Sequence, residues 1–378
     1  MRSAVHCQTA RWPFTPSSAP DPAVTRERVK ELDLLRFGAA LMVVLYHYAA
    51  FGPAKGLSTL HYPALAPIAQ YGFLGVELFF MISGFVILMS ASGGSVRRFV
   101  VSRVVRLYPA FWVCCTLTFL VTLLIGAPKF SASVSQYLWN LPMIAGFFHV
   151  PPIDGSYWTL YVELRFYALV AAVLLLRQMH RVEGLLQAWF AVILVLHVQP
   201  LRGLNTLLIP NFACYFIAGA VCYLIWDRGA TPLRLGLLAG TWSLAEYSML
   251  SDLAGASMGA GSFAAGINPV VVALAISVLF AVMLCVALRR TGRLGRGNWV
   301  GVGALTYPLY LLHQYIADMV FNRAYPGINP HLLFWSVVVS MLLAAYAAHR
   351  WVERPLAGPL KAALNRWLDT LEARFSLP

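Results

Sequence analysis

Ten runs of mostly apolar residues restrict the fold of this chain more than any other feature of its sequence. About 20 residues of α-helix cross the roughly 30 Å hydrocarbon core of a bilayer. The sequence therefore predicts an all-α, polytopic transmembrane helix bundle with about ten spans. Polar residues dilute the fifth and seventh runs, so counts of nine or eleven remain alternatives. The predicted spans are residues 32–52, 69–91, 108–127, 156–176, 184–200, 206–226, 232–250, 268–288, 298–320 and 331–352.

The composition excludes an ordinary soluble domain. Of the 378 residues, 60% are hydrophobic and 11% are charged, against about 45–50% and about 25% in soluble domains. The six cysteines lie mostly inside apolar runs without a ligand spacing to histidine, so we expect neither a disulfide framework nor a metal site. The expected location is the cell inner (plasma) membrane, with the chain crossing it many times.

The positive charge follows the predicted topology. The formal net charge is +13, and 22 of the 28 Lys and Arg residues fall in one set of alternate loops or in the span ends that adjoin them. Lys and Arg concentrate in short cytoplasmic loops, so both termini are predicted to be cytoplasmic. The opposite loops hold only Lys55, Lys129, Arg202 and Arg323. Because the charge is spread over these loops and forms no single patch, no nucleic-acid partner is expected.

Three regions are predicted along the chain. Residues 1–30 hold a Ser/Pro stretch without an apolar core and are expected to be a disordered cytoplasmic lead. Residues 31–356 form the membrane domain. Residues 357–378 form an amphipathic cytoplasmic tail. The tail helix has two interpretations, namely a helix lying on the inner leaflet and a helix packed on the membrane domain.

Ionisable residues inside the predicted first span need a partner or a function, since each costs about 2.5–3.5 kcal/mol on insertion scales. Arg36 and His47 are eleven residues apart and share one helical face. Asp33 precedes Arg36 by three residues, so one interpretation of Arg36 is an interfacial ion pair. The alternative to a functional His47 is a core histidine bonded to a carbonyl.

Two layers of charge are predicted across the bundle. Counted from the outer ends of their spans, His47, Glu77 and Glu163 lie about five to eight residues deep, which places three titratable groups in one outer layer. Arg103 and Arg106 are neighbours on one helical face near the inner surface, as is Arg36. Guanidinium groups suit a phosphate-bearing ligand. The alternative is that these arginines only set the topology.

The ordered set of motifs resembles the acyltransferase 3 family of integral-membrane acyltransferases, many of which O-acetylate surface polysaccharides. The set comprises Arg36 and His47, Gly-Val-Glu-Leu-Phe-Phe-Met-Ile-Ser-Gly-Phe at 75–85, Arg-x-x-Arg before Tyr-Pro at 103–109, and Trp-Thr-Leu-Tyr-Val-Glu at 158–163. Later segments agree, including Thr-Tyr-Pro-Leu-Tyr-Leu-Leu-His at 306–313 and Glu-Arg-Pro at 353–355. The likeness covers about residues 31–356.

The resemblance implies transfer of an acyl group, with acetyl favoured, from cytoplasmic acyl-CoA to a hydroxyl of a saccharide or glycoconjugate at the outer side. No permanently bound cofactor is implied. Arg36, Arg103 and Arg106 would bind the acyl-CoA phosphates. His47 would be the general base, with Glu163 or Glu77 orienting its imidazole. The residues expected to line the substrate path are Trp158, Tyr161, Tyr167 and His313.

Two other classes of protein use intramembrane charge. In a proton-coupled secondary transporter or exporter, the same histidine and carboxylates would form a proton relay, although the sequence lacks the internal repeat of many transporters. In a non-catalytic scaffold, intramembrane charges would be few and locally paired. The sequence identifies neither the acceptor hydroxyl nor an oligomeric state.

Overall fold

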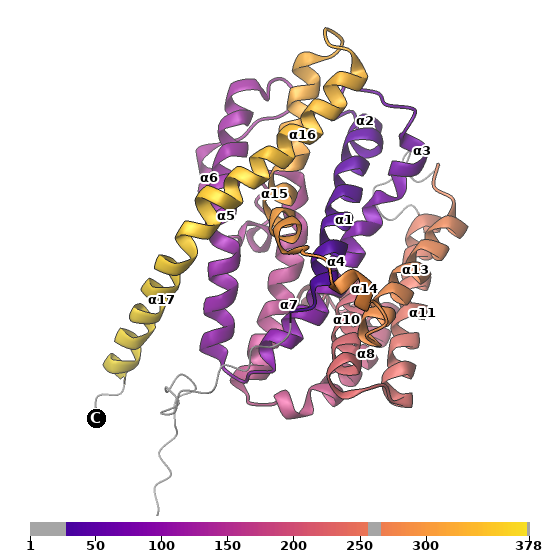
Figure 1. Cartoon of the computed structure of the whole chain (residues 1–378), viewed down its shortest axis with the longest axis vertical. Helices are drawn as coiled ribbons and strands as arrows, with labels where there is room; N and C mark the ends of the chain where they lie inside the picture. Colours follow the sequence, from indigo (N-terminus) through magenta and orange to yellow (C-terminus); the bar gives the residue numbers. More distant parts are fainter. Residues whose placement is uncertain (1–27, 256–265, 376–378) are drawn as a thin grey trace, which may run out of the picture.

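The computed structural model describes residues 28–255 and 266–375, which form helices and connecting turns without a β-strand. Each predicted span coincides with a helix of at least 17 residues (Figure 1). These helices are α1 (Lys30–Tyr46), α4 (Gly75–Ala91), α5 (Val96–Ile125), α7 (Trp158–Leu175), α8 (Val182–Val198), α10 (Pro210–Arg228), α11 (Pro232–Gly255), α13 (Pro269–Ala287), α15 (Val300–Ala324) and α16 (Pro330–Ala348). The all-α, multi-span prediction is confirmed.

Eight helical segments in the described part of the chain are long and apolar enough to cross a membrane. The two remaining predicted spans correspond to α11 and α15, which are 24 and 25 residues long. Helix α15 carries buried polar residues, among them His313, Gln314 and Asp318, and it packs against α1, α5 and α16. These polar residues lower the mean hydropathy of α15, and they face the neighbouring helices. The count of ten and the cytoplasmic side of the termini stay predictions.

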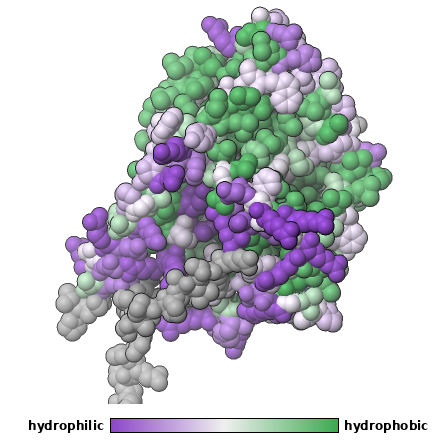
Figure 2. All heavy atoms as spheres, in the orientation of Figure 1, coloured by the Kyte–Doolittle hydropathy of each residue, from purple (hydrophilic) through white to green (hydrophobic). Residues whose placement is uncertain are grey.

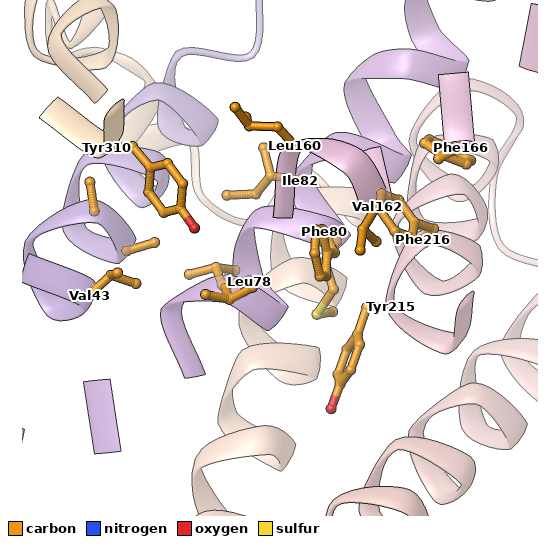
Figure 3. Close-up of a cluster of buried hydrophobic side chains, with 14 of the residues drawn as sticks. Val43, Leu78, Phe80, Ile82, Leu160, Val162, Phe166, Tyr215, Phe216 and Tyr310 are labelled. Carbon is orange, nitrogen blue, oxygen red and sulfur yellow. The ribbon is translucent and has the colours of Figure 1, made fainter. Parts of the chain in front are cut away.

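The core of the bundle is the contact between α4 and α10. A Cβ on Gly84 would overlap the carbonyl oxygen of Phe216, and a Cβ on Gly219 would overlap that of Met81. Small residues let helix backbones approach this closely inside membranes. Aromatic rings extend the contact, because the ring of Phe216 lies 4.7 Å from that of Phe80 and 4.4 Å from that of Phe166 (Figure 3).

The segment between α5 and α7 folds back into the bundle and contains the short helix α6 (Val134–Asn140). The first part of this segment packs along α5 toward its N-terminal half. Trp112 donates to Leu141 O over 3.1 Å, and Tyr108 donates to Pro142 O over 3.0 Å. Tyr108 and Trp112 lie 17 and 13 residues before the end of α5 at Ile125. The segment is therefore re-entrant, although the sequence predicted an external loop.

The re-entrant segment also fixes where α7 begins. Ser156 Oγ donates to Tyr310 O over 3.3 Å, and Tyr157 OH donates to Leu311 O over 3.2 Å. Asp154 Oδ2 accepts from Tyr315 N over 2.9 Å. These contacts lie near the middle of α15, so α7 starts about half-way through the bundle and not at its outer surface.

The C-terminal helix α17 (Arg354–Phe375) continues α16 through a π-helical turn, His349–Glu353, and passes along α5 (Figure 1). Arg97 on α5 forms a 2.6 Å ion pair with Asp369 and donates to Asn365 O over 2.9 Å. These contacts agree with a tail packed on the membrane domain. Residues 1–27 of the predicted lead and residues 376–378 of the tail lie outside the described part of the chain.

The visible face of the molecule separates polar from apolar residues. In Figure 2 apolar side chains cover the upper part of this face, and hydrophilic side chains gather in its lower part. The exposed apolar side chains include Leu332, Trp335, Val339 and Leu343 on α16. A broad apolar surface on a helix bundle suits contact with lipid.

Candidate active site

Two adjoining cavities hold most of the residues singled out in the sequence. We call them the inner cavity and the outer cavity, after the predicted topology. The inner cavity has a volume of about 410 Å³ and includes Arg36, Arg103, Arg106 and Glu163 in its lining. The outer cavity has a volume of about 530 Å³ and is lined by His47, among others. Both volumes are in the range of small-molecule sites.

The inner cavity is basic at one end and apolar over much of its wall. Three arginines face one carboxylate, that of Glu163, whose Oε1 accepts from Ser83 Oγ over 2.6 Å. The guanidinium group of Arg103 lies 6.0 Å from the Tyr167 ring. The apolar part of the wall comprises Val76, Phe79, Phe80, Val86, Leu107 and Leu160. Such a site favours an anion carrying an apolar or weakly polar extension.

The ion pair between Arg36 and Asp33, the alternative interpretation of Arg36, does not form among the described residues. Asp33 instead accepts from the guanidinium group of Arg28, over 2.8 Å and 3.1 Å. Arg28 precedes α1, which begins at Lys30. Arg36 instead lines the inner cavity.

A network of three residues supports the basic end of the inner cavity. Glu353 is 7% exposed, and its Oε2 lies 2.7 Å from His349 Nδ1. Its Oε1 lies 3.7 Å from Arg106 Nη1. The Arg106 guanidinium also lies 5.8 Å from the ring centroid of Tyr307. This network restrains Arg106 without a close bidentate pair, so its remaining donors are available to a ligand.

The outer cavity combines His47 with aromatic rings and a buried carboxylate. Trp158, which is 42% exposed, lies against Phe212 with 5.4 Å between ring centroids. Glu77 is 4% exposed, and its Oε2 has no hydrogen-bond partner within the described residues. Flat rings and a free carboxylate oxygen can receive the apolar and hydroxyl faces of a polar organic molecule.

His47 begins a π-helical turn, His47–Phe51, at the end of α1. Short π-helical turns often occur at functional sites. The turn places the imidazole beside a second histidine, His313 on α15, with 4.9 Å between the ring centroids. The sequence did not predict the contact between these two histidines.

The hydrogen bonds assign the tautomers of the two histidines. His313 Nδ1 lies 2.7 Å from Tyr310 O, and His47 Nδ1 lies 2.9 Å from Val43 O. A carbonyl oxygen only accepts, so in the neutral rings each Nδ1 carries the proton. His313 Nε2 is then an acceptor, 3.1 Å from His47 Nδ1. The remaining nitrogen of His47, Nε2, keeps the lone pair that a general base requires.

The structure corrects the predicted outer layer of three titratable groups. His47 and Glu77 line the outer cavity, but Glu163 lines the inner cavity with the arginines. The prediction counted the depth of Glu163 from an outer surface at residue 156, whereas α7 starts near the middle of α15. The orienting partners of His47 are also different, because His313 and Val43 occupy the place predicted for Glu163 or Glu77.

The four predicted substrate-path residues occupy four different positions, two of which line the cavities. Trp158 lines the outer cavity and Tyr167 the inner cavity. Tyr161 lines neither cavity, since its hydroxyl donates to Asn140 Oδ1 over 3.2 Å and its ring lies against Gly146 in the re-entrant segment. His313 is fully buried behind His47. Tyr161 and His313 thus support the site and do not form its surface.

Comparison with known proteins identifies the family of the chain. The family model described as "Acyltransferase domain", that of the acyltransferase 3 family, matches residues 29–350. The chain is 26% identical over 302 residues to the exopolysaccharide production protein ExoZ of Rhizobium meliloti (strain 1021), covering 75% of this chain and 89% of that protein. It is 27% identical over 357 residues to nodulation protein 10 of Rhizobium leguminosarum bv. viciae, covering 85% and 92%. No solved structure gives a significant match.

The family model spans the helices from α1 to α16 and every residue that lines the two cavities. It assigns a class of chemistry, the transfer of acyl groups other than aminoacyl groups, that a secondary transporter or a scaffold does not perform. The chain is a membrane acyltransferase and belongs to the acyltransferase 3 family.

Proposed function

We propose that this protein transfers a short acyl group, acetyl in the simplest case, from cytoplasmic acyl-CoA to a hydroxyl of a saccharide or glycoconjugate at the outer side of the cell inner (plasma) membrane. The observation that carries the proposal is that the two cavities are lined by different ionisable groups. Arginines line the inner cavity, and a histidine with a defined tautomer lines the adjoining outer cavity.

The donor fits the inner cavity by charge. Acyl-CoA carries several phosphate charges at one end and an uncharged thioester arm at the other. Arg36, Arg103 and Arg106 would bind phosphate oxygens through guanidinium forks. The thioester arm would then extend along the apolar wall toward the outer cavity.

The transfer step follows from the tautomer of His47. The acceptor hydroxyl oxygen attacks the thioester carbonyl carbon, so a C–O bond forms, and the hydroxyl proton moves to His47 Nε2. The C–S bond then breaks, and the leaving CoA thiolate takes the proton to become the thiol. During the step His47 is cationic, and His313 Nε2 stabilises it by accepting from Nδ1–H, 3.1 Å away.

The acceptor class rests on the outer cavity and on the relatives. A sugar ring presents apolar C–H faces and hydroxyl edges, which suit the Trp158 and Phe212 rings and the free Glu77 Oε2. ExoZ is named for exopolysaccharide production. An exopolysaccharide or its lipid-linked precursor is therefore the first acceptor to test.

We expect Arg103 and Arg106 to act on donor binding. Replacing either residue by Ala removes a guanidinium from the inner cavity and should raise the KM for acetyl-CoA by about tenfold or more, because charge-assisted hydrogen bonds contribute about 1.5–3 kcal/mol. Lys should restore binding only in part, since it lacks the planar fork. The measurement is transfer of labelled acetyl from acetyl-CoA to exopolysaccharide by the purified protein in proteoliposomes.

Arg98 offers a matched control for these variants. It lies on the same helix, is exposed, and does not line the inner cavity, so Arg98→Ala should leave the KM for acetyl-CoA unchanged. Full rescue by Lys at both positions, or an equal effect of Arg98→Ala, contradicts the proposed donor site. Absence of acetyl transfer by the wild-type protein to any saccharide acceptor contradicts the proposed donor and acceptor together.

A further inference from the structure

Two side chains form the boundary between the cavities. Val76 from α4 and Tyr310 from α15 each line both the inner and the outer cavity. Both are nearly buried, with 9% and 8% of their surface exposed. His47 lines the outer cavity, and the three arginines line the inner one. Val76 and Tyr310 therefore lie between the arginines of the inner cavity and His47 of the outer cavity.

The Tyr310 side chain is held in place from three directions. Its hydroxyl lies 2.8 Å from Thr159 Oγ1 and donates to Ser156 O over 3.3 Å. Its ring meets that of Phe79 edge to face, with 5.7 Å between the centroids. Figure 3 shows the Tyr310 ring projecting from α15 with its hydroxyl directed into the bundle. These contacts restrict the rotamer of Tyr310, so the ring is a fixed wall.

The position of Val76 is fixed by its helix. The preceding residue, Gly75, packs so closely on α1 that a Cβ there would lie 2.6 Å from Ala39 O and 2.9 Å from Val43 Cγ2. Helix α4 is also clamped to α10 on its other side, through Gly84 and Gly219. Val76 is β-branched, which leaves one strongly preferred χ1 rotamer in a helix. The valine wall is therefore as rigid as the tyrosine wall.

We propose that Val76 and Tyr310 form an aperture through which the acyl group passes, and that its width selects straight-chain acyl groups over groups branched next to the carbonyl. This inference rests on the proposed function and adds the determinant of donor choice. An acetyl group presents one methyl to the aperture, whereas an isobutyryl group presents two methyls side by side. A rigid boundary between a valine and a tethered ring discriminates by this cross-section.

The hydrogen bond between Thr159 and the Tyr310 hydroxyl, here called the tether, holds the aperture at its width. Thr159 lines the inner cavity and bonds to the Tyr310 hydroxyl. Without that bond the ring can turn about its side-chain torsions and widen the aperture. Tyr310 also links the aperture to the base, because its carbonyl oxygen accepts from His313 Nδ1, and His313 contacts His47.

The test compares transfer from isobutyryl-CoA and acetyl-CoA to one acceptor in proteoliposomes, using the ratio of the two kcat/KM values. Val76→Ala deletes two methyl groups from the wall and should raise the isobutyryl-to-acetyl ratio about tenfold or more, since one methylene in an apolar pocket discriminates about 10- to 200-fold. Val76→Ile keeps the branch, adds a methylene and should lower the ratio. The control is Val86→Ala, which removes the same atoms from the inner cavity away from the boundary and should leave the ratio unchanged.

Tyr310→Phe and Thr159→Val each remove one hydroxyl of the tether, and both should raise the ratio, with no further increase in the double variant. A ratio that stays at the wild-type value in Val76→Ala, Val76→Ile and Tyr310→Phe overturns the aperture, whatever happens to the absolute rates. An equal rise in Val86→Ala overturns it as well. Wild-type transfer from acetyl-CoA is measured in the same assay, and its absence would contradict the proposed function and not the selectivity argument alone.

Discussion

Replacing His47 by Gln should lower acyl transfer by about 10²- to 10⁴-fold, the usual contribution of a general base. Gln keeps much of the size of the side chain and can still donate to Val43 O, but its amide cannot take up the hydroxyl proton. The protein should fold normally and still bind acyl-CoA, because the arginines line a different cavity. The measurement is kcat for acetyl transfer, with acetyl-CoA binding recorded on the same samples.

His313 provides the comparison for this variant. His313→Gln removes the Nε2 lone pair that lies 3.1 Å from His47 Nδ1, and it should lower kcat by less than His47→Gln because the base itself remains. The double variant should be no slower than His47→Gln, since the two rings act as a unit. Near-normal transfer by His47→Gln would falsify the assignment of His47 as the base.

Replacing Gly219 by Ala should lower the free energy of unfolding more than any other substitution described for this chain. The added Cβ would overlap the carbonyl oxygen of Met81, and a backbone atom cannot move aside without separating α4 from α10. Overpacking of a tight core costs about 1–3 kcal/mol and sometimes more. We expect a markedly lower Tm in detergent, measured by loss of the monodisperse peak in size-exclusion chromatography after heating.

Gly184 is the matched control, because it also lies in a membrane helix and a Cβ there meets nothing within 4 Å. Gly184→Ala should be neutral or slightly stabilising, since Ala exceeds Gly in helix propensity by about 1 kcal/mol. Equal Tm values for Gly219→Ala and the wild-type protein would show that the α4–α10 contact is looser than described.

Much of the fold could be predicted because the bilayer imposes a single length scale. Apolar runs of about 20 residues located the helices. The sequence also separated the arginines from His47, since their positions at opposite ends of their spans do not depend on how the loops fold.

The depth of Glu163 could not be predicted because it depends on a loop. The sequence treated residues 128–155 as external, and only tertiary contacts such as Trp112 to Leu141 place part of them deep in the bundle. A signal was present in the apolar side chains of that loop, including Leu138, Trp139, Ile144, Phe147 and Phe148. A loop with so many apolar residues is a candidate for a re-entrant segment.

The contacts between site residues on different helices also could not be predicted from the sequence. His47 and His313 are 266 residues apart, and Arg106 and Glu353 are separated by most of the chain. Helical periodicity tells which residues share a face of one helix, but not which faces of two helices meet. The pairing of α1 with α15, and of α5 with the end of α16, had to come from the structure.

The central claim is that donor and acceptor reach the site from opposite sides of the membrane. It is tested in sealed membrane vesicles with the cytoplasmic face outward and saccharide acceptor enclosed in the lumen, to which labelled acetyl-CoA is added outside. Our account predicts that label is recovered on the enclosed saccharide, with wild-type protein and not with His47→Gln. Label recovered only on saccharide added outside, on the same side as acetyl-CoA, would contradict transfer between the two cavities.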